Sequence, residues 1–410
     1  MKTRRVVVKI GSSSLTAENG TLSSEKMKSL VNQLVYLCNV RHSDVILVSS
    51  GAVAAGLSRL GWNRASITIP ENQAAAAVGQ SYLIEMYRDL FAGSGLEIAQ
   101  LLLTRADIED RKRFIHIRNT LETLLRHHIV PVVNENDTVA VEEIRFGDND
   151  TLASLVALVA QADLVVLLTD IDGLYDKNPR VSPEAKRISD VWEITEQIEN
   201  MAGGEGSLAG TGGMRTKLLA AKIATNSGID VVIANSNEPQ VLEQVLLGNG
   251  IGTVFHARQN ALHGKKSWLA HGTRTEGRLT LDSGAVQAVI NHSASLLVPG
   301  IRRVEGEFHE GAVVDLCAEG GQTIARGIVT FSAGDLRTLL ERKQHGEKMN
   351  HVQEVVHRDL HQGIRGVAVR QIAPHEHHGG AGRRRQDNAP GDVLIGVRRR
   401  DPGGEHEPEE

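Results

Sequence analysis

The chain has 410 residues, a formal net charge of −5 and 41% hydrophobic residues, enough for one large core and one small core. The slightly acidic balance excludes a global basic field that would attract nucleic acid or anionic membranes, which favours a small ligand as the partner. Cys38 and Cys317 are the only cysteines, too few for a disulfide framework or a cysteine-rich zinc site.

The sequence contains no apolar run of the roughly 18 residues that a membrane span requires. Its basic start, with Lys2, Arg4 and Arg5, is not followed by the apolar run and cleavage pattern of a signal peptide. We therefore expect a cytoplasmic protein that has no membrane partner.

Six short runs rich in Val, Leu and Ile each end in small or polar residues. Continuous apolar runs predict strands buried on both faces of a parallel sheet. Helical patterns separate them, as in the spacing of Met27, Leu30 and Leu34 after the candidate N-cap Ser23. This alternation predicts a doubly wound α/β domain over residues 1–258. With their polar ends, the six runs span residues 6–12, 45–51, 101–104, 132–137, 165–170 and 231–236.

In such a sheet ligands bind beyond the carboxyl ends of the strands. The first strand carries Lys9, whose burial is costly unless an anion meets it, and Gly11 then lets backbone N–H groups approach that anion. A snorkelling lysine explains this motif alone equally well. The second strand ends in Ser50 and Gly51, a tight turn that offers a second anion site but lacks the G-x-S-x-G order of a serine hydrolase.

Carboxylates and amides gather after the fourth strand. Such clusters suit Mg²⁺, an ammonium group or the anchoring of lysines, and the Asn amides can donate to a substrate carboxylate. Each stretch alone is more typical of an Asx-rich turn. The cluster comprises Asn134, Asp137, Asp148, Asn149 and Asp150.

The fifth strand closes with Thr169 and Asp170, and a Gly-rich stretch at 206–217 then runs into a helical pattern. Loop amides and a helix N-terminus form an anion site, to which Lys217 adds a point charge. The spacing is not that of a Walker A loop, and a Gly-rich loop alone is more often a surface turn. Together, two lysines on Gly-rich turns, a carboxylate cluster and a Ser-Gly turn at one sheet edge indicate phosphoryl transfer.

Beyond a polar linker at 259–276, short β-like runs surround a helical pattern and predict a small β-rich domain over 277–360. Residues 361–410 are rich in Arg, His, Gly and Pro, and we expect this atypical tail to be disordered. Our hypothesis is that it arises from a shifted frame or a run-on past the usual stop. We interpret the histidines of the tail as solvated, and we predict no resident metal site.

In this order, the motifs resemble the amino acid kinase superfamily, and within it the kinases that phosphorylate the γ-carboxylate of L-glutamate in the first step of proline synthesis. Residues 277 to about 340 resemble the PUA module of many bacterial members. The resemblance implies a mainly parallel sheet sandwiched by helices, with ATP and Mg²⁺ as the cofactors. It rests on VVVKIGSSSLT, VSSGAVAAG, LLLTRADIEDRKRF, PVVNENDTVA, FGDNDTLAS, LLTDIDGLYDKNPR and GTGGMRTKL.

The resemblance also implies residue roles. Lys9 and Lys217 would stabilise the transferring phosphoryl group, and Asp150 would hold both lysines. Glutamate would be bound by Ser50, Asn134, Asp137, Asp148 and Asn149. The nucleotide would be bound by Lys9, Gly11, Thr169, Asp170, Thr211, Gly212, Gly213, Met214, Arg215, Thr216 and Lys217.

Members of this family are oligomeric and inhibited by proline at or near the glutamate site, so we expect a homo-oligomer, a dimer or tetramer, with proline as inhibitor. One alternative is a kinase of the same superfamily for aspartate, acetylglutamate, carbamate or isopentenyl phosphate. Another is an RNA-binding regulatory protein acting through the PUA-like domain. Against RNA binding as the main role, aromatic residues are 3% of the chain and no dense basic stripe is present.

Overall fold

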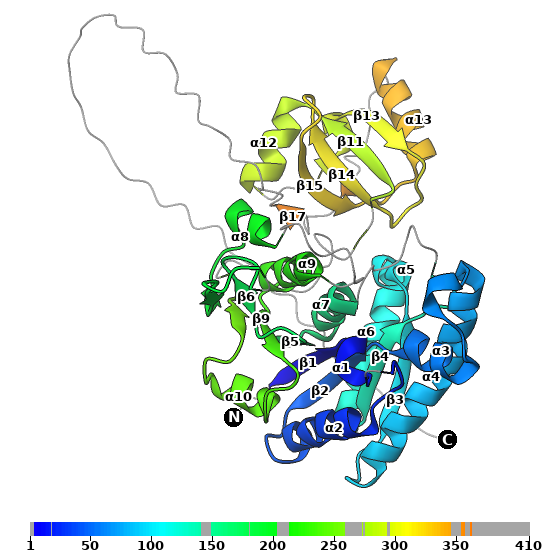
Figure 1. Ribbon diagram of the computed structural model, residues 1–410. Coiled ribbons are helices and arrows are strands. Elements are labelled where there is room, and N and C mark those ends of the chain that lie inside the picture. Colours follow the sequence, from blue (N-terminus) through cyan, green and yellow to red (C-terminus); the bar gives the residue numbers. More distant parts are fainter. Residues whose placement is uncertain are drawn as a thin grey trace, which may run out of the picture. The chain divides into compact units, whose positions relative to one another are not determined.

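The computed structural model describes residues 4–17, 19–140, 149–179, 181–202, 213–258, 273, 275–292, 296–345, 354–356 and 361–362. An eight-stranded sheet with the order β3-β4-β2-β1-β5-β9-β10-β8 forms the centre of the first domain (Figure 1). All six predicted strands are confirmed and run parallel, so their carboxyl ends meet at one edge. They are β1 (Arg5–Ile10), β2 (Asp44–Ser49), β3 (Ile98–Leu103), β4 (Val130–Glu135), β5 (Leu164–Thr169) and β9 (Asp230–Asn235).

Two features of the sheet differ from the prediction. Strand β3 ends the sheet and is not buried on both faces, since Gln100 and Leu102 are exposed. At the other end, β10 (Thr253–Phe255) runs antiparallel to β9 and pairs with β8 (Asp190–Val191). These last strands are too short to give a distinct periodic signal in the sequence.

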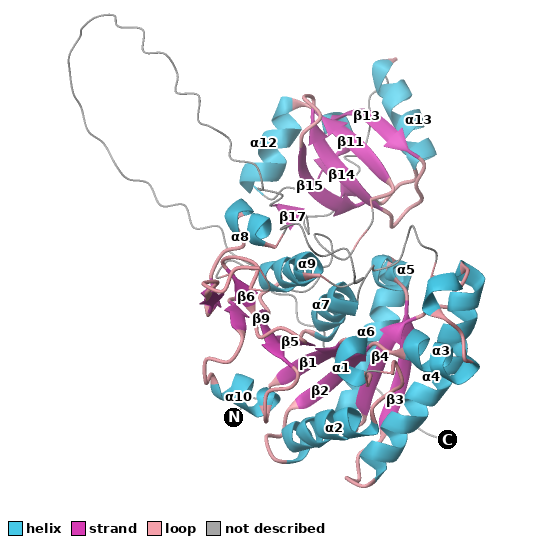
Figure 2. Ribbon diagram, in the orientation of Figure 1, coloured by secondary structure: helices cyan, strands magenta, loops and turns pink. Residues whose placement is uncertain are grey.

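Helices cover both faces of the sheet (Figure 2). Alternate strand residues point to opposite faces, so Val6 and Val8 join one apolar cluster while Val7 joins the other. The first cluster packs against α2 (Ser24–Asn39), α4 (Ile69–Ala92) and α10 (Val241–Leu247). The second packs against α6 (Arg111–Arg126), α7 (Asn149–Ala160) and α9 (Met214–Asn226).

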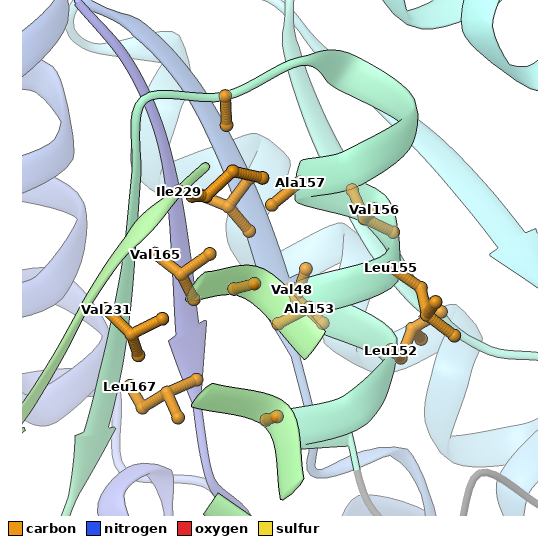
Figure 3. Close-up of a cluster of buried hydrophobic side chains, with 14 of the residues drawn as sticks. Val48, Leu152, Ala153, Leu155, Val156, Ala157, Val165, Leu167, Ile229 and Val231 are labelled. Atoms are coloured by element: carbon orange, nitrogen blue, oxygen red, sulfur yellow. The ribbon is translucent and has the colours of Figure 1, made fainter. Parts of the chain in front are cut away.

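Helix α7 is the most deeply buried helix of this domain among the described residues. Every residue from Asp150 to Ala160 is buried, because the helix lies between the sheet, α6 and α9. Its apolar side chains pack with Val165 of β5 and Val231 of β9 in one cluster (Figure 3). A helix that is buried all round is held in place by the protein core. Its first turn carries Asp150, which contacts Lys9 near the end of β1.

Shorter elements complete the first domain. The N-cap Ser23 accepts a hydrogen bond from the Lys26 N–H, as its position before α2 predicts. None of the described helices has the length and apolar character needed to cross a membrane. The short elements are α1 (Ser12–Leu15), α3 (Ala52–Leu60), a 3-10 turn at Arg64–Ser66, α5 (Arg105–Glu109), β6 (Leu174–Tyr175), β7 (Arg187–Ile188) and α8 (Glu196–Met201).

The second domain is built on a five-stranded sheet with the order β13-β11-β14-β15-β17. It has its own core, which includes Leu279, Leu316 and Leu336. Its last strand, at residues 361–362, pairs with β15. Its elements are β11 (Gly277–Leu281), α12 (Ser283–His292), β12 (Leu296–Leu297), a 3-10 turn at Val298–Gly300, β13 (Ile301–Gly306), β14 (Val313–Ala318), β15 (Thr323–Ile328), α13 (Ala333–Gln344), β16 (Glu354–Val356) and β17 (His361–Gln362).

Most of the predicted linker at 259–276, and the tail from residue 363 onward, lie outside the described residues. The predictions made for them therefore stay predictions.

Candidate active site

Two lysines and an aspartate form a buried triad at the carboxyl edge of the sheet. Lys9 is the penultimate residue of β1, Asp150 lies in the first turn of α7, and Lys217 lies in the first turn of α9. Lys9 Nζ is 2.6 Å from Asp150 Oδ1, and Lys217 Nζ is 3.0 Å from Asp150 Oδ2. Thr216 Oγ1 donates a further hydrogen bond, 3.1 Å long, to Asp150 Oδ2.

The three charged side chains of this triad are buried. Lys9, Asp150 and Lys217 are only 4%, 0% and 5% exposed. Removing such charges from water is costly unless they are paired, and one carboxylate here meets two ammonium groups. The triad therefore carries one net positive charge. Helix α9 adds the positive end of its dipole close to this charge, so the arrangement suits an anionic ligand such as phosphate.

Gly11 lies beside Lys9 at the carboxyl end of β1. A Cβ atom at Gly11 would lie 3.8 Å from Lys9 Nζ, which places the Gly11 backbone next to that ammonium group. The following short helix is tied to the end of β9 by a hydrogen bond of 2.9 Å from Ser236 Oγ to Ser14 Oγ. The motif that begins at Lys9 thus borders the same edge as the triad.

The predicted nucleotide residues lie along this edge as far as the structure describes them. Thr169 ends β5 and donates through Oγ1 to Asp170 Oδ1 at 3.0 Å. Gly213 is the N-cap of α9, and Met214, Arg215 and Thr216 form its first turn. Thr211 and Gly212 lie outside the described residues.

The amide cluster gathers beside the triad. Asn149 Nδ2 donates to Ser50 Oγ at 2.7 Å and to Asn134 Oδ1 at 3.0 Å. These three side chains come from α7, the end of β2 and the end of β4. Asp137 lies half-buried in the turn that follows β4. Asp148, the remaining predicted substrate residue, lies outside the described residues.

Close helix packing fixes the turn that carries Ser50. Gly51 has φ +111°, a left-handed conformation that strains any other residue, and α3 begins directly after it. Helices α3 and α4 then approach so closely that a Cβ at Gly56 would lie 1.8 Å from Ala75 O. A Cβ at Gly79 would lie 1.8 Å from Ala52 O.

Two residues of α4 that the sequence reasoning missed support this cluster. Gln80 Oε1 accepts a hydrogen bond of 2.8 Å from Asn134 Nδ2, and the Tyr87 hydroxyl lies 2.8 Å from Ser49 Oγ. Burial raises the pKa of Tyr87 well above its ordinary value, so its hydroxyl stays protonated. The sequence did contain a signal for Gln80. It lies on the same face of α4 as the buried Ala76 and Leu83, and a polar residue within such an apolar face indicates a buried hydrogen bond.

The donor set gives a limited fit to a divalent cation. Within the described ranges, no three His, Cys, Asp or Glu side chains gather as a metal site. Both oxygens of Asp150 face the lysine ammonium groups. Mg²⁺ commonly keeps several waters and binds through substrate phosphates with one or two carboxylates, so it fits here as part of a nucleotide complex.

Comparisons with known proteins identify the family of the chain. Residues 4–235 match the amino acid kinase family, and residues 277–352 match the PUA domain. The chain is 47% identical over 360 residues to a glutamate 5-kinase of Moorella thermoacetica, covering 87% of this chain and 95% of that protein. It is 45% identical over 359 residues to one from Caldanaerobacter subterraneus subsp. tengcongensis, covering 87% and 96%. It is 46% identical over 363 residues to one from Geobacillus thermodenitrificans, covering 88% and 97%.

The parallel sheet and the sequence relationships together place the chain in the kinase class of phosphotransferases. The chain belongs to the amino acid kinase family, and within it to the glutamate 5-kinases, with a PUA domain at its carboxyl side.

Proposed function

We propose that this chain transfers the γ-phosphoryl group of ATP to the γ-carboxylate of L-glutamate, giving L-glutamyl 5-phosphate and ADP at the start of proline biosynthesis. The observation that carries the proposal is the buried triad of Lys9, Asp150 and Lys217 beside the amide cluster. The name shared by the relatives described above, glutamate 5-kinase, supports glutamate over other small acids.

The chemistry follows from the charges. A carboxylate oxygen of the acceptor attacks the γ-phosphorus, the bond to the β,γ-bridging oxygen breaks, and ADP leaves with that electron pair. A glutamate side chain has an ordinary pKa of about 4.3 and is ionised at neutral pH, so no general base is needed. The protein must supply alignment and charge neutralisation, and Lys9 and Lys217 supply the positive charge. Asp150 holds both ammonium groups in place.

In this proposal the nucleotide and glutamate bind to different residues of the site. The nucleotide, with its Mg²⁺, lies along the ends of β5 and β9 near Thr169, Asp170 and the first turn of α9. Glutamate lies against Ser50, Asn134 and Asn149, whose hydroxyl and amide groups suit the polar groups of an amino acid. The half-buried carboxylate of Asp137 suits the ammonium group of an amino acid, as does Asp148 of the same predicted cluster.

An ADP-release assay with hydroxylamine present tests the proposal. The purified chain is given ATP and Mg²⁺ with L-glutamate, L-aspartate or N-acetylglutamate. We expect turnover and hydroxamate formation with L-glutamate only, because hydroxylamine traps an acyl phosphate. Turnover with another acid instead would move the assignment to that substrate. No turnover from folded, ATP-binding protein would overturn it.

Three further properties belong to the proposal: a homo-oligomer, inhibition by proline, and a cytoplasmic location. The open edge of β3, with Leu102 exposed, is a surface that a second copy could cover. Light scattering on the purified chain tests for a dimer or tetramer, and glutamate titrations with millimolar proline test for inhibition. Fractionation of the producing cells tests the location.

RNA binding is not proposed as a function of the second domain. Binding to the phosphates of RNA requires positive side chains. Three arginines of this domain are paired with carboxylates, which offset their positive charge. The pairs are Arg303 with Glu305 at 3.0 Å, Arg326 with Asp315 at 2.9 Å and Arg337 with Glu307 at 2.7 Å.

A further inference from the structure

A chain of hydrogen-bonded amides leads from the interior of α4 to the candidate substrate site. Asn134 Nδ2 donates to Gln80 Oε1 at 2.8 Å, and Asn134 Oδ1 accepts from Asn149 Nδ2 at 3.0 Å. Gln80 and Asn134 are 9% and 3% exposed, so water has little access to this chain. Among the described residues, Gln80 forms a hydrogen bond with Asn134 and with no other candidate substrate residue.

Two backbone groups determine the direction of these amides. The oxygen and nitrogen of an amide side chain are distinguished by their partners. The Glu135 N–H can only donate, and it lies 2.9 Å from Asn134 Oδ1. The Ser49 carbonyl can only accept, and it lies 3.4 Å from Asn149 Nδ2. Asn134 must therefore turn Nδ2 toward Gln80, and Gln80 must offer it an acceptor.

This direction has a consequence for Asn149. Its Nδ2 group is engaged by Ser50 Oγ, Asn134 Oδ1 and the Ser49 carbonyl. Its Oδ1 is buried and has no hydrogen-bond partner among the described residues. A buried acceptor in that state is costly and is normally satisfied when a donor becomes available. The Asn149 amide is thus set to hold Ser50 on one side and to accept from a donor on the other.

We propose that Gln80 is a positioning residue for the acceptor substrate. By accepting from Asn134, it holds the Asn134 and Asn149 amides in the direction that the Glu135 N–H and the Ser49 carbonyl require. Asn149 Oδ1 is then available to an N–H donor such as the ammonium group of an amino acid. The inference rests on the proposed function, because it assigns these amides to the acceptor side of that site. It predicts that changing Gln80 alters the use of the acceptor and leaves the nucleotide side unaffected.

The experiment compares two variants. Gln80→Met keeps the side-chain length but removes the hydrogen-bond acceptor for Asn134, whereas Gln80→Glu retains an acceptor oxygen. The matched control is Gln33→Met, since Gln33 Oε1 accepts from the Leu242 N–H at 3.2 Å in a different part of the domain. KM for L-glutamate, KM for ATP, kcat and the thermal midpoint are measured for all four proteins.

For Gln80→Met we expect KM for L-glutamate to rise by about tenfold or more, with KM for ATP and kcat changed by less than about threefold. Gln80→Glu should return KM for glutamate to within about threefold of the unsubstituted chain, and Gln33→Met should alter the thermal midpoint only. A purely structural role would lower the thermal midpoint without separating the two KM values.

An unchanged KM for glutamate in folded Gln80→Met would overturn the inference while leaving the proposed function intact. If Gln80→Met does not fold, the Gln80→Glu variant tests the inference. The carboxylate of this variant still offers Asn134 an acceptor, so a rise of about tenfold in its KM for L-glutamate would contradict the inference. Absence of glutamate-dependent turnover in the unsubstituted chain would instead remove the proposed function, and this inference with it.

Discussion

Lys217 follows Asp150 by 67 residues in the sequence, yet Lys217 Nζ lies 3.0 Å from Asp150 Oδ2 in the fold. The contact joins the first turns of α7 and α9, and these helices pack side by side on one face of the sheet. Lys9 reaches the other oxygen of the same carboxylate from β1. Three separate elements therefore share one buried charge centre, and its members should respond differently to substitution.

Replacing either lysine of the triad should reduce catalysis without unfolding the chain. We expect Lys217→Met to lower kcat by about 10²–10³, the typical cost of losing one preorganised charge-stabilising donor. Lys222→Met is the matched control, because Lys222 lies on the same helix but is exposed and pairs with Glu199 at 2.6 Å. Steady-state assays measure both variants. A loss in Lys222→Met as large as that in Lys217→Met would contradict a specific role for the triad.

Replacing the shared carboxylate should cost stability as well as activity. Asp150→Asn leaves two buried ammonium groups uncompensated, and breaking a buried ion pair in this way costs about 3–5 kcal/mol. Urea unfolding should show this loss, and added phosphate should raise the thermal midpoint of the variant more than that of the unsubstituted chain. Asp44→Asn is the control, since the Arg5–Asp44 pair at 3.1 Å is partly exposed and should contribute less. Equal losses in the two variants would refute the prediction.

The close contact between α3 and α4 predicts opposite effects for two glycines of one region. Gly79→Ala places a Cβ 1.8 Å from Ala52 O, so the helices must separate, and overpacking of this kind costs about 1–3 kcal/mol. Gly93→Ala, at the end of α4, meets no atom within 4 Å and has φ −66°, so it should be neutral or slightly stabilising. Thermal unfolding of both variants checks the signs. A stable Gly79→Ala would show that the helices separate at little cost.

Removal of residues 363–410 should leave the enzyme intact. The described sheet of the second domain ends at Gln362, and the match to the Moorella relative spans 360 residues and 95% of that protein. We expect kcat, both KM values and the thermal midpoint of the shortened chain to stay within about twofold of the full chain, because a segment of this composition buries little surface. A lost activity would show that the tail contributes to the site.

The two cysteines should be inert in the native protein. Burial raises the pKa of Cys38 to about 12, so its reactive thiolate is scarce at neutral pH, and Cys317 is fully buried. A thiol reagent at pH 8 should react slowly with the folded chain and count two thiols after denaturation. Kinase activity should survive the native treatment. Rapid modification of one thiol in the folded protein would contradict this prediction.

Much of the first domain could be predicted because burial leaves a local pattern. Each of the six strands has an apolar run, and the parallel arrangement brings the residues after Lys9, Ser49 and Thr169 to one edge. The short strands β8 and β10 could not be predicted in the same way, because two or three residues carry no clear periodicity. The exposure of Leu102 depends on the place of β3 at the end of the sheet, which its apolar run does not encode.

By itself, the sequence determined the fold class and the family, and it singled out Lys9, Asp150 and Lys217, which the structure brings together at the sheet edge. The family resemblance implied that Asp150 holds both lysines, and the tertiary structure supplied the geometry, with each lysine on a different oxygen of the carboxylate. Only the tertiary structure decided that Gln80 supports Asn134. Side-chain periodicity reports which residues are buried along one element, whereas these pairings depend on how α7, α9 and α4 pack against the sheet. The contacts that hold the site are therefore properties of long-range packing.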